Sequence, residues 1–206
     1  MKNIKSIIFD LGVVLLNIDY QKTINEFDKL GISKASEFYS KKTQTNIFNL
    51  LECGEISEEY FVKKIQLSCK NASKKQILFA WNALLLDLPQ ERIELLKNLK
   101  RKYPIYLLSN TNSIHISEFR RQIGEELYIE FYNIFNKVYY SHEIGYRKPN
   151  AEAFKIILEE NNLKPNEVLF IDDSPQHIEG AKRLGIQSHH LQDNEEITTL
   201  FPDIIL

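Results

Sequence analysis

Four short apolar runs, with a weaker fifth, constrain the fold of this chain more than any other feature. Each is nearly continuous in Ile, Val, Leu, Tyr and Phe, which is typical of strands buried on both faces of a parallel sheet. From about residue 90 onward, amphipathic segments alternate with these runs. The sequence therefore predicts an α/β protein with an open, doubly wound parallel sheet and right-handed crossovers. The runs are "KSIIFD" at 5–10, "PIYLLSN" at 104–110, "NKVYYS" at 136–141, "EVLFID" at 167–172 and, more weakly, "QSHHLQ" at 187–192.

Residues 17–88 depart from that alternation because they carry helical patterns with few strand signals. Ser57 is followed by two glutamates, as is typical of a helix N-cap. We therefore expect a core of residues 1–16 and 89–206, and a helical insertion over 17–88, which we term the cap segment. An insertion after the first strand can cover the carboxyl edge of the sheet, where open α/β sheets bind ligands. The expected helices lie in "YQKTINEFDKLG", "KASEFYSKKTQTNIFNLLECG", "SEEYFVKKIQLSC" and "SKKQILFAWNALLLD".

Charge and cysteine content exclude several classes of protein. The formal net charge of −2 supplies no basic field for a nucleic acid, so we expect no nucleic-acid partner. No stretch is long and apolar enough to cross a membrane, and Asp10 interrupts the only run that resembles a signal peptide. Cys53 and Cys69 form no metal or redox motif, which indicates reduced thiols in a cytoplasmic protein. We expect a monomer or a homodimer.

Polar residues follow the predicted strands at the points where these strands end. Each one alone is ordinary turn or helix-capping chemistry. A parallel sheet, however, brings its carboxyl ends to one edge, where the carboxylates would repel unless a divalent cation lay between them. Oxygen ligands suit Mg²⁺, and a hydroxyl, an amide and an ammonium group suit phosphate oxygens. The pattern predicts phosphoryl transfer to a carboxylate. The residues are Asp10, Ser109, Asn110, Asp172 and Asp173, with Lys148 from a loop.

Four motifs in this order resemble those of the haloacid dehalogenase superfamily. They are "FDLGVVL" at 9–15, "LLSNTN" at 107–112, "GYRKPN" at 145–150 and "LFIDDS" at 169–174. The resemblance covers essentially the whole chain and implies a Rossmann-like doubly wound parallel sheet with a helical cap inserted after the first strand. Within the superfamily, the chain is most similar to bacterial sugar-phosphate phosphatases with a helical cap, of the α-D-glucose-1-phosphate phosphatase type.

The resemblance implies roles for the residues that bind and transfer phosphate. Asp10 would attack phosphorus, become an aspartyl phosphate and also contact Mg²⁺. Ser109 and the backbone N–H of Asn110 would hold phosphate oxygens. Lys148 would bridge Asp10 and the phosphate.

The resemblance also implies a Mg²⁺ site and a substrate contact from the cap segment. Asp172 would bind the metal directly, with Asp173 beside it, and the backbone carbonyl of Gly12 would be a further ligand. The turn "ECGEIS" at 52–57 matches a cap element that lowers over the active site, with Glu55 as a candidate substrate contact. A plain helix–helix turn closed by a glycine explains this element equally well.

Two residues depart from the usual phosphatase pattern. Gly12 stands where an acid normally protonates the leaving oxygen, and positioned acid–base catalysis is worth about 10²- to 10⁴-fold. The anomeric oxygen of a sugar 1-phosphate, a good leaving group, could compensate. Asp19, His142 or a metal-bound water could instead replace the acid. His177 stands where the similar phosphatases tend to carry Asn, and it could titrate near neutral pH.

Several functions follow from these observations. The first is a Mg²⁺-dependent phosphatase of a small phosphorylated metabolite, a sugar phosphate with the 1-phosphate favoured. The second is a dehalogenase, which would need no metal and would give the acidic pair Asp172–Asp173 no purpose. The third is a non-catalytic or regulatory protein that has lost the acid at Gly12. A mutase or phosphotransferase would need that missing acid most and ranks last.

Overall fold

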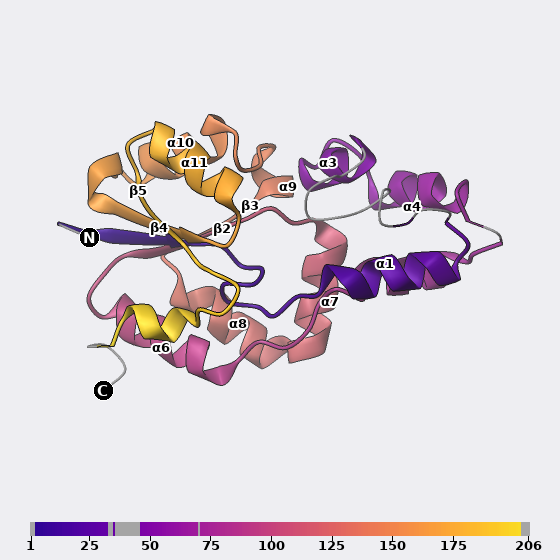
Figure 1. Ribbon diagram of the computed structural model, residues 1–206, viewed down its shortest axis with the longest axis horizontal. Coiled ribbons are helices and arrows are strands. Elements are labelled where there is room, and N and C mark those ends of the chain that lie inside the picture. The colour runs from indigo at the N-terminus through magenta and orange to yellow at the C-terminus, as the bar shows by residue number, and fades with distance from the viewer. Residues whose placement is uncertain (1–2, 33–34, 36–45, 70, 203–206) are drawn as a thin grey trace.

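The computed structural model describes residues 3–32, 35, 46–69 and 71–202. Its centre is a sheet of five parallel strands in the order β3-β2-β1-β4-β5 (Figure 1). In the central strand, Ile7 pairs with Ile105 on one side and with Leu169 on the other. The predicted doubly wound α/β fold is confirmed, with each strand inside its predicted run. The strands are β1 (Ser6–Phe9), β2 (Ile105–Ser109), β3 (Lys137–Tyr140), β4 (Val168–Asp172) and β5 (Gln187–His190).

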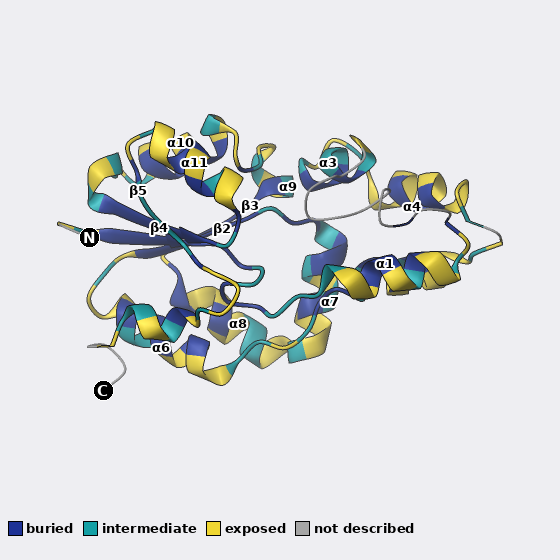
Figure 2. Ribbon diagram, in the orientation of Figure 1, coloured by how far each residue is buried: buried dark blue, intermediate teal, exposed yellow. Residues whose placement is uncertain are grey.

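Two layers of helices cover the sheet, and the central strands are buried on both faces (Figures 1 and 2). On one face, α10 and α11 pack against Ile8, Leu108 and Phe170. On the other face, α6 and α8 pack against alternate residues such as Phe9 and Leu107. Burial on both faces explains why the strands are continuously apolar. The helices of the two layers are α6 (Gln90–Lys100), α7 (Ser113–Ile123), α8 (Glu125–Ile134), α10 (Ala151–Glu160) and α11 (Pro175–Arg183).

The connection between β2 and β3 contains two helices, where the alternation predicts one. Gly124 separates α7 from α8 with a φ of 83°, a backbone conformation that favours glycine. Shorter elements complete the core. They are α9 (Ser141–Ile144) and the 3₁₀ turns η1 (Pro165–Glu167) and η2 (Ile197–Leu200).

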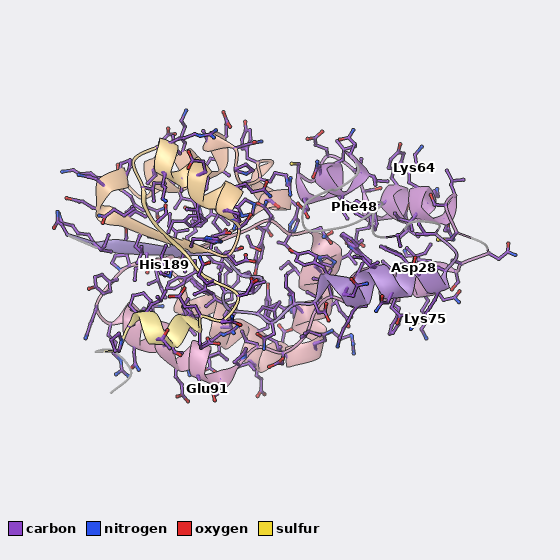
Figure 3. The ribbon with its side chains drawn as sticks, in the orientation of Figure 1. Asp28, Phe48, Lys64, Lys75, Glu91 and His189 are labelled. Carbon is purple, nitrogen blue, oxygen red and sulfur yellow. The ribbon has the colours of Figure 1, made fainter. Side chains whose placement is uncertain are left out.

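The cap segment folds into helices beside the sheet, on the right of Figure 1. Phe48, Phe61 and Trp81 form its aromatic centre, with ring centroids of Phe48 and Trp81 5.0 Å apart. Phe48 points among the helices, whereas Lys64 and Lys75 lie on the outside (Figure 3). Residues 36–45 of the second expected helix lie outside the described residues. The described helices are α1 (Tyr20–Lys29), α3 (Asn46–Glu52), α4 (Glu58–Gln66) and α5 (Lys74–Asn82).

One capping residue starts a cap-segment helix where the sequence predicts it. The Ser57 side chain accepts a hydrogen bond from the Tyr60 N–H, as expected for the N-cap of α4. The segment leaves and re-enters the core through two paired stretches, in which Ile18 and Leu85 form an antiparallel bridge. One hydrophobic cluster continues from these helices into the sheet, so the division at residues 16/17 and 88/89 stays a prediction. Among the described residues, no helix is long and apolar enough to cross a membrane.

Candidate active site

Asp10 directly follows β1 and lies at the carboxyl edge of the sheet, as its position in the first apolar run predicts. Its N–H donates to the carbonyl oxygen of Ile171, which continues the pairing with β4 by one residue. Its carboxylate accepts a hydrogen bond of 2.7 Å from the Leu11 N–H. Asp10 is 8% exposed and lines a cavity. Its carboxylate is therefore fixed by a hydrogen bond and can still be reached from the cavity.

Lys148 lies completely buried between two carboxylates. Its Nζ is 2.7 Å from Oδ1 of Asp10 and 2.7 Å from Oδ2 of Asp172. The Asn110 side chain fixes the lysine backbone from both sides, because its Nδ2 donates to the Lys148 carbonyl and its Oδ1 accepts from the Lys148 N–H. A buried ammonium is tolerated here because two carboxylates neutralise it.

Asp172 ends β4, and its carboxylate accepts hydrogen bonds from Lys148 and from the residues that follow the strand. Oδ1 accepts a 2.7 Å hydrogen bond from the Ser174 N–H, and His177 Nδ1 lies 3.0 Å from both oxygens. Burial alone would raise the pKa of Asp172, but Lys148 and His177 outweigh it and hold that pKa well below its usual range. Asp172 therefore stays ionised.

The pKa of Asp10 is shifted in the opposite direction to that of Asp172. Burial is the largest cause and raises the pKa of Asp10 well above its usual range, Lys148 opposes this rise, and Asp172 and Asp173 add to it. A further cation between these carboxylates would lower the pKa of Asp10 and favour its ionised, nucleophilic form.

The donor set fits a magnesium ion. Asp10, Asp172 and His177 each offer a ligand atom, and these atoms lie within 4.8 Å of one another. Asp173 and Gly12 line the same cavity, so a third carboxylate and a backbone carbonyl are near. The carboxylate and carbonyl oxygens of this set are the hard donors that Mg²⁺ prefers in proteins, whereas the imidazole nitrogen of His177 is not.

The cavity, of about 100 Å³, collects most of the residues that the sequence predicts. Lys148 and Asp172 have no exposed surface and are not among the described residues that line the cavity, but Lys148 contacts Asp10, which lines it. Glu55 is exposed and is not among the described residues that line the cavity, so its contact with substrate stays a prediction. The predicted residues in the lining are Asp10, Gly12, Ser109, Asn110 and Asp173.

The sequence analysis does not single out several polar residues that line the cavity. They are Tyr20, Glu52, Thr111, His115, Arg147, Ser174 and Gln176. Arg147 precedes Lys148 in the third motif, and its Nε and Nη2 lie 2.9 and 2.8 Å from Oε2 of Glu52, at the end of α3. Position within the motif could have drawn attention to Arg147. Nothing in the sequence sets Glu52 or Tyr20 apart from neighbouring helical residues.

The structure also locates the suggested replacements for an acid at Gly12. A Cβ at that position would lie 2.9 Å from Cδ1 of Ile18, the end of a side chain that would have to shift to admit it. Asp19 caps α1 by accepting from the Gln21 N–H, and His142 Nδ1 lies 3.3 Å from the Thr111 carbonyl oxygen. Neither is among the described residues in the cavity lining.

Comparison with known proteins identifies the family. The family model described as a haloacid dehalogenase-like hydrolase matches residues 4–185. The chain belongs to the haloacid dehalogenase-like hydrolases. This hydrolase is 32% identical over 191 residues to D-ribitol-5-phosphate phosphatase of Bacteroides thetaiotaomicron, with 90% of each chain covered.

Solved structures of similar hydrolases have the same architecture. A haloacid dehalogenase family enzyme of Bacteroides thetaiotaomicron superimposes with a TM-score of 0.89 at 36% identity, covering 96% of this chain and 98% of that one. That structure is of a mutant with an aspartate replaced by alanine, in complex with magnesium and inorganic phosphate. A haloacid dehalogenase-like hydrolase of Porphyromonas gingivalis gives a TM-score of 0.84 at 28% identity, with 98% of both chains covered.

Proposed function

We propose that this hydrolase is a Mg²⁺-dependent phosphatase of a small phosphorylated sugar or sugar alcohol. The proposal rests mainly on two buried ion pairs, Lys148–Asp10 and Lys148–Asp172. They lie beside a small cavity at the carboxyl edge of the sheet. The relatives that bind magnesium and phosphate, or that act on D-ribitol 5-phosphate, support it.

In the proposed reaction, a carboxylate oxygen of Asp10 attacks phosphorus, and water later hydrolyses the resulting aspartyl phosphate. The Ser109 hydroxyl and the Asn110 backbone N–H hold phosphate oxygens. Lys148, already 2.7 Å from Asp10, contacts both the nucleophile and the phosphate. Its positive charge stabilises the negative charge of the transition state.

Magnesium would be held by the carboxylates of Asp10, Asp172 and Asp173 and by the carbonyl of Gly12. When bound, it would supply positive charge that offsets repulsion between these carboxylates and the incoming phosphate. The requirement for a cation also separates this function from a dehalogenase, for which the acidic pair Asp172–Asp173 would have no purpose.

The cap segment is proposed to cover the cavity and to exclude water from the reaction. Leu84 and Leu85 of its returning stretch, together with Tyr20 and Glu52, contribute to the cavity wall. A preference for sugar 1-phosphates remains part of the proposal and rests on Gly12. A cytoplasmic location rests on the free thiols of Cys53 and Cys69.

Phosphate release tests the proposal, with D-ribitol 5-phosphate, glucose 1-phosphate and glucose 6-phosphate as substrates. We expect release by the wild type with Mg²⁺, loss of release in EDTA, and loss by at least about 10³-fold in Asp10→Asn. Asp19→Asn is the matched control, because asparagine caps a helix as well as aspartate does and residue 19 does not line the cavity.

Each outcome has a defined meaning. Equal kcat/KM for glucose 1-phosphate and glucose 6-phosphate would remove the anomeric preference alone. Full turnover in Asp10→Asn would exclude the aspartyl-phosphate route. No release of phosphate from any ester by the folded wild type would favour the regulatory alternative, and halide release from a haloacid without metal would favour a dehalogenase.

A further inference from the structure

The peptide group between Asp173 and Ser174 connects the proposed magnesium site to the neighbouring strand. Its N–H, which belongs to Ser174, donates a 2.7 Å hydrogen bond to Oδ1 of Asp172. Its carbonyl oxygen, which belongs to Asp173, lies 3.1 Å from Nε2 of His190 at the end of β5. Because the N–H and C=O of a planar trans peptide point in opposite directions, these two hydrogen bonds hold the group from both sides.

A side chain reaches this peptide group at the point where the sheet ends and the next helix begins. The Asp172 carbonyl accepts from the Leu191 N–H, which continues the pairing of β4 with β5. The Ser174 carbonyl accepts from N–H groups in the first turn of α11. Between them, the Asp173 carbonyl accepts from the imidazole of His190.

Gln192 determines which nitrogen of His190 carries the proton. The Nε2 of Gln192 lies 2.9 Å from the His190 carbonyl oxygen, which can only accept, and 2.9 Å from Nδ1 of His190. The amide group therefore donates to both atoms, and Nδ1 accepts. An imidazole that accepts at Nδ1 carries its proton on Nε2, the nitrogen that faces the Asp173 carbonyl.

His190 contacts this peptide group from outside the catalytic cavity. Among the described residues, those that line the catalytic cavity include Asp173 and Ser174 but not His190. His190 lines a second cavity, of about 410 Å³, and Asp173 and Ser174 line that cavity too. A substitution at position 190 therefore removes no group that touches the substrate in the proposed reaction.

Two other residues hold the Asp172 carboxylate, and both contact it directly. Lys148 has a catalytic role in the proposed reaction, and His177 lines the catalytic cavity and offers a possible ligand atom. A change in either residue would alter the charge or the ligands of the site as well as its geometry. His190 reaches the same carboxylate through one peptide group, so its effect on geometry can be measured separately.

We propose that His190 is a positioning residue of the magnesium site. Its Nε2–H fixes the orientation of the peptide group whose N–H holds Asp172, and it fixes the backbone from which the Asp173 side chain extends. Loss of a group that orients metal ligands in this way typically weakens metal binding by about 10- to 100-fold. The inference rests on the proposed function, in which Asp172 and Asp173 hold magnesium.

Magnesium binding in the absence of substrate tests this role. His190→Leu removes the N–H donor, so the dissociation constant for Mg²⁺, measured by isothermal titration calorimetry, should rise by about 10- to 100-fold. The Mg²⁺ concentration that gives half of the maximal phosphate release should rise by the same factor. At saturating Mg²⁺, kcat should stay near the wild-type value. His190→Gln keeps an N–H donor and should recover most of the affinity.

His189→Leu is the matched control. Residue 189 directly precedes His190 in β5, and its Nε2 lies 3.0 Å from Oε2 of Glu195. The same substitution at this position should leave the affinity for Mg²⁺ unchanged. Circular dichroism shows whether each variant is folded, and His190→Ala takes the place of His190→Leu if leucine prevents folding.

The outcomes separate this role from the proposed function. Unchanged Mg²⁺ affinity in folded His190→Leu, an equal loss in His189→Leu, or no recovery in His190→Gln would overturn the role of His190, while the phosphatase function of an active wild type stands. Mg²⁺ binding that depends on His190, in a wild type that releases phosphate from no ester, would support the role of His190 and overturn the phosphatase function. A folded wild type that binds no Mg²⁺ would overturn both.

Discussion

Lys148 shows how strongly one residue of this site depends on its neighbours. It is fully buried, and both of its charged partners are carboxylates at 2.7 Å. Burial would lower the pKa of Lys148, but Asp10 and Asp172 outweigh burial and raise it. Removal of the ammonium would leave two buried carboxylates without their shared cation, which is the costly way to break a buried ion pair.

Lys148→Met should therefore destabilise the protein by about 3–5 kcal/mol in EDTA. A divalent cation at the same carboxylates should partly replace the lost charge, so Mg²⁺ should raise the melting temperature of the variant more than that of the wild type. Thermal unfolding with Mg²⁺ and with EDTA measures both effects.

Lys5→Met is the control for this experiment, because Lys5 pairs with Glu167 at the surface and its loss should change stability little in either buffer. A Lys148→Met variant as stable as the wild type in EDTA would show that the ammonium does not hold the carboxylates together.

Helix α11 shows how one element positions the site through close backbone approach. A Cβ at Gly180 would lie 2.6 Å from the carbonyl oxygen of Pro149, the residue after Lys148. In Gly180→Ala, the higher helix propensity of alanine should stabilise the protein by about 1 kcal/mol. The clash with Pro149 should destabilise it by about 1–3 kcal/mol and displace the loop that contains Lys148. We expect a lower melting temperature together with a lower kcat. Lys182→Ala, at an exposed position of the same helix, should change neither.

The contact between α5 and α7 should make the stability of the protein depend on pH. His115 of α7 stacks on Trp81 of α5 with ring centroids 4.5 Å apart, and burial lowers the pKa of His115 to about 4. Because the unfolded histidine titrates near pH 6.5, protons bind preferentially to the unfolded chain between these values. The neutral His115 therefore contributes to the free energy of unfolding. This contribution is complete above pH 6.5, and on the order of 3 kcal/mol of it is lost as the pH falls toward 4.

Urea unfolding at a series of pH values should detect this loss in the wild type. In His115→Gln the free energy of unfolding should be lower at pH 7.5 and should fall less steeply between pH 6.5 and 4. The difference between the two proteins removes the contribution of carboxylates that both share. Parallel slopes would show that His115 is not the titrating group.

The elements also show what the sequence can predict. The strands were predictable because burial on both faces makes them short and continuously apolar, and Asp10 and Asp172 were predictable because they end such strands. Which residues of the cap segment line the cavity was not predictable, because this depends on packing between distant helices. The substrate contact of Glu55 in the cap turn therefore stays a prediction, whereas Glu52, three residues earlier, lines the cavity.

At the scale of the whole molecule, one hydrophobic cluster joins the cap segment to the sheet. It continues from Phe48 and Trp81 through Leu16 to Leu107 of β2. Trp81 is the single tryptophan of the chain and lies in the cap segment, so its fluorescence reports that segment and its contact with α7. Far-ultraviolet circular dichroism reports all the helices.

Because the cluster is shared, the cap segment and the core should unfold together, and both probes should give the same urea midpoint. Phe48→Ala removes a fully buried ring from the cap segment and should destabilise the protein by about 3–5 kcal/mol. If unfolding is cooperative, this variant should lower both midpoints equally. A fluorescence midpoint that moves alone, ahead of the circular dichroism midpoint, would mean that the cap segment melts independently and that its attachment to the core is a hinge, not a continuous core.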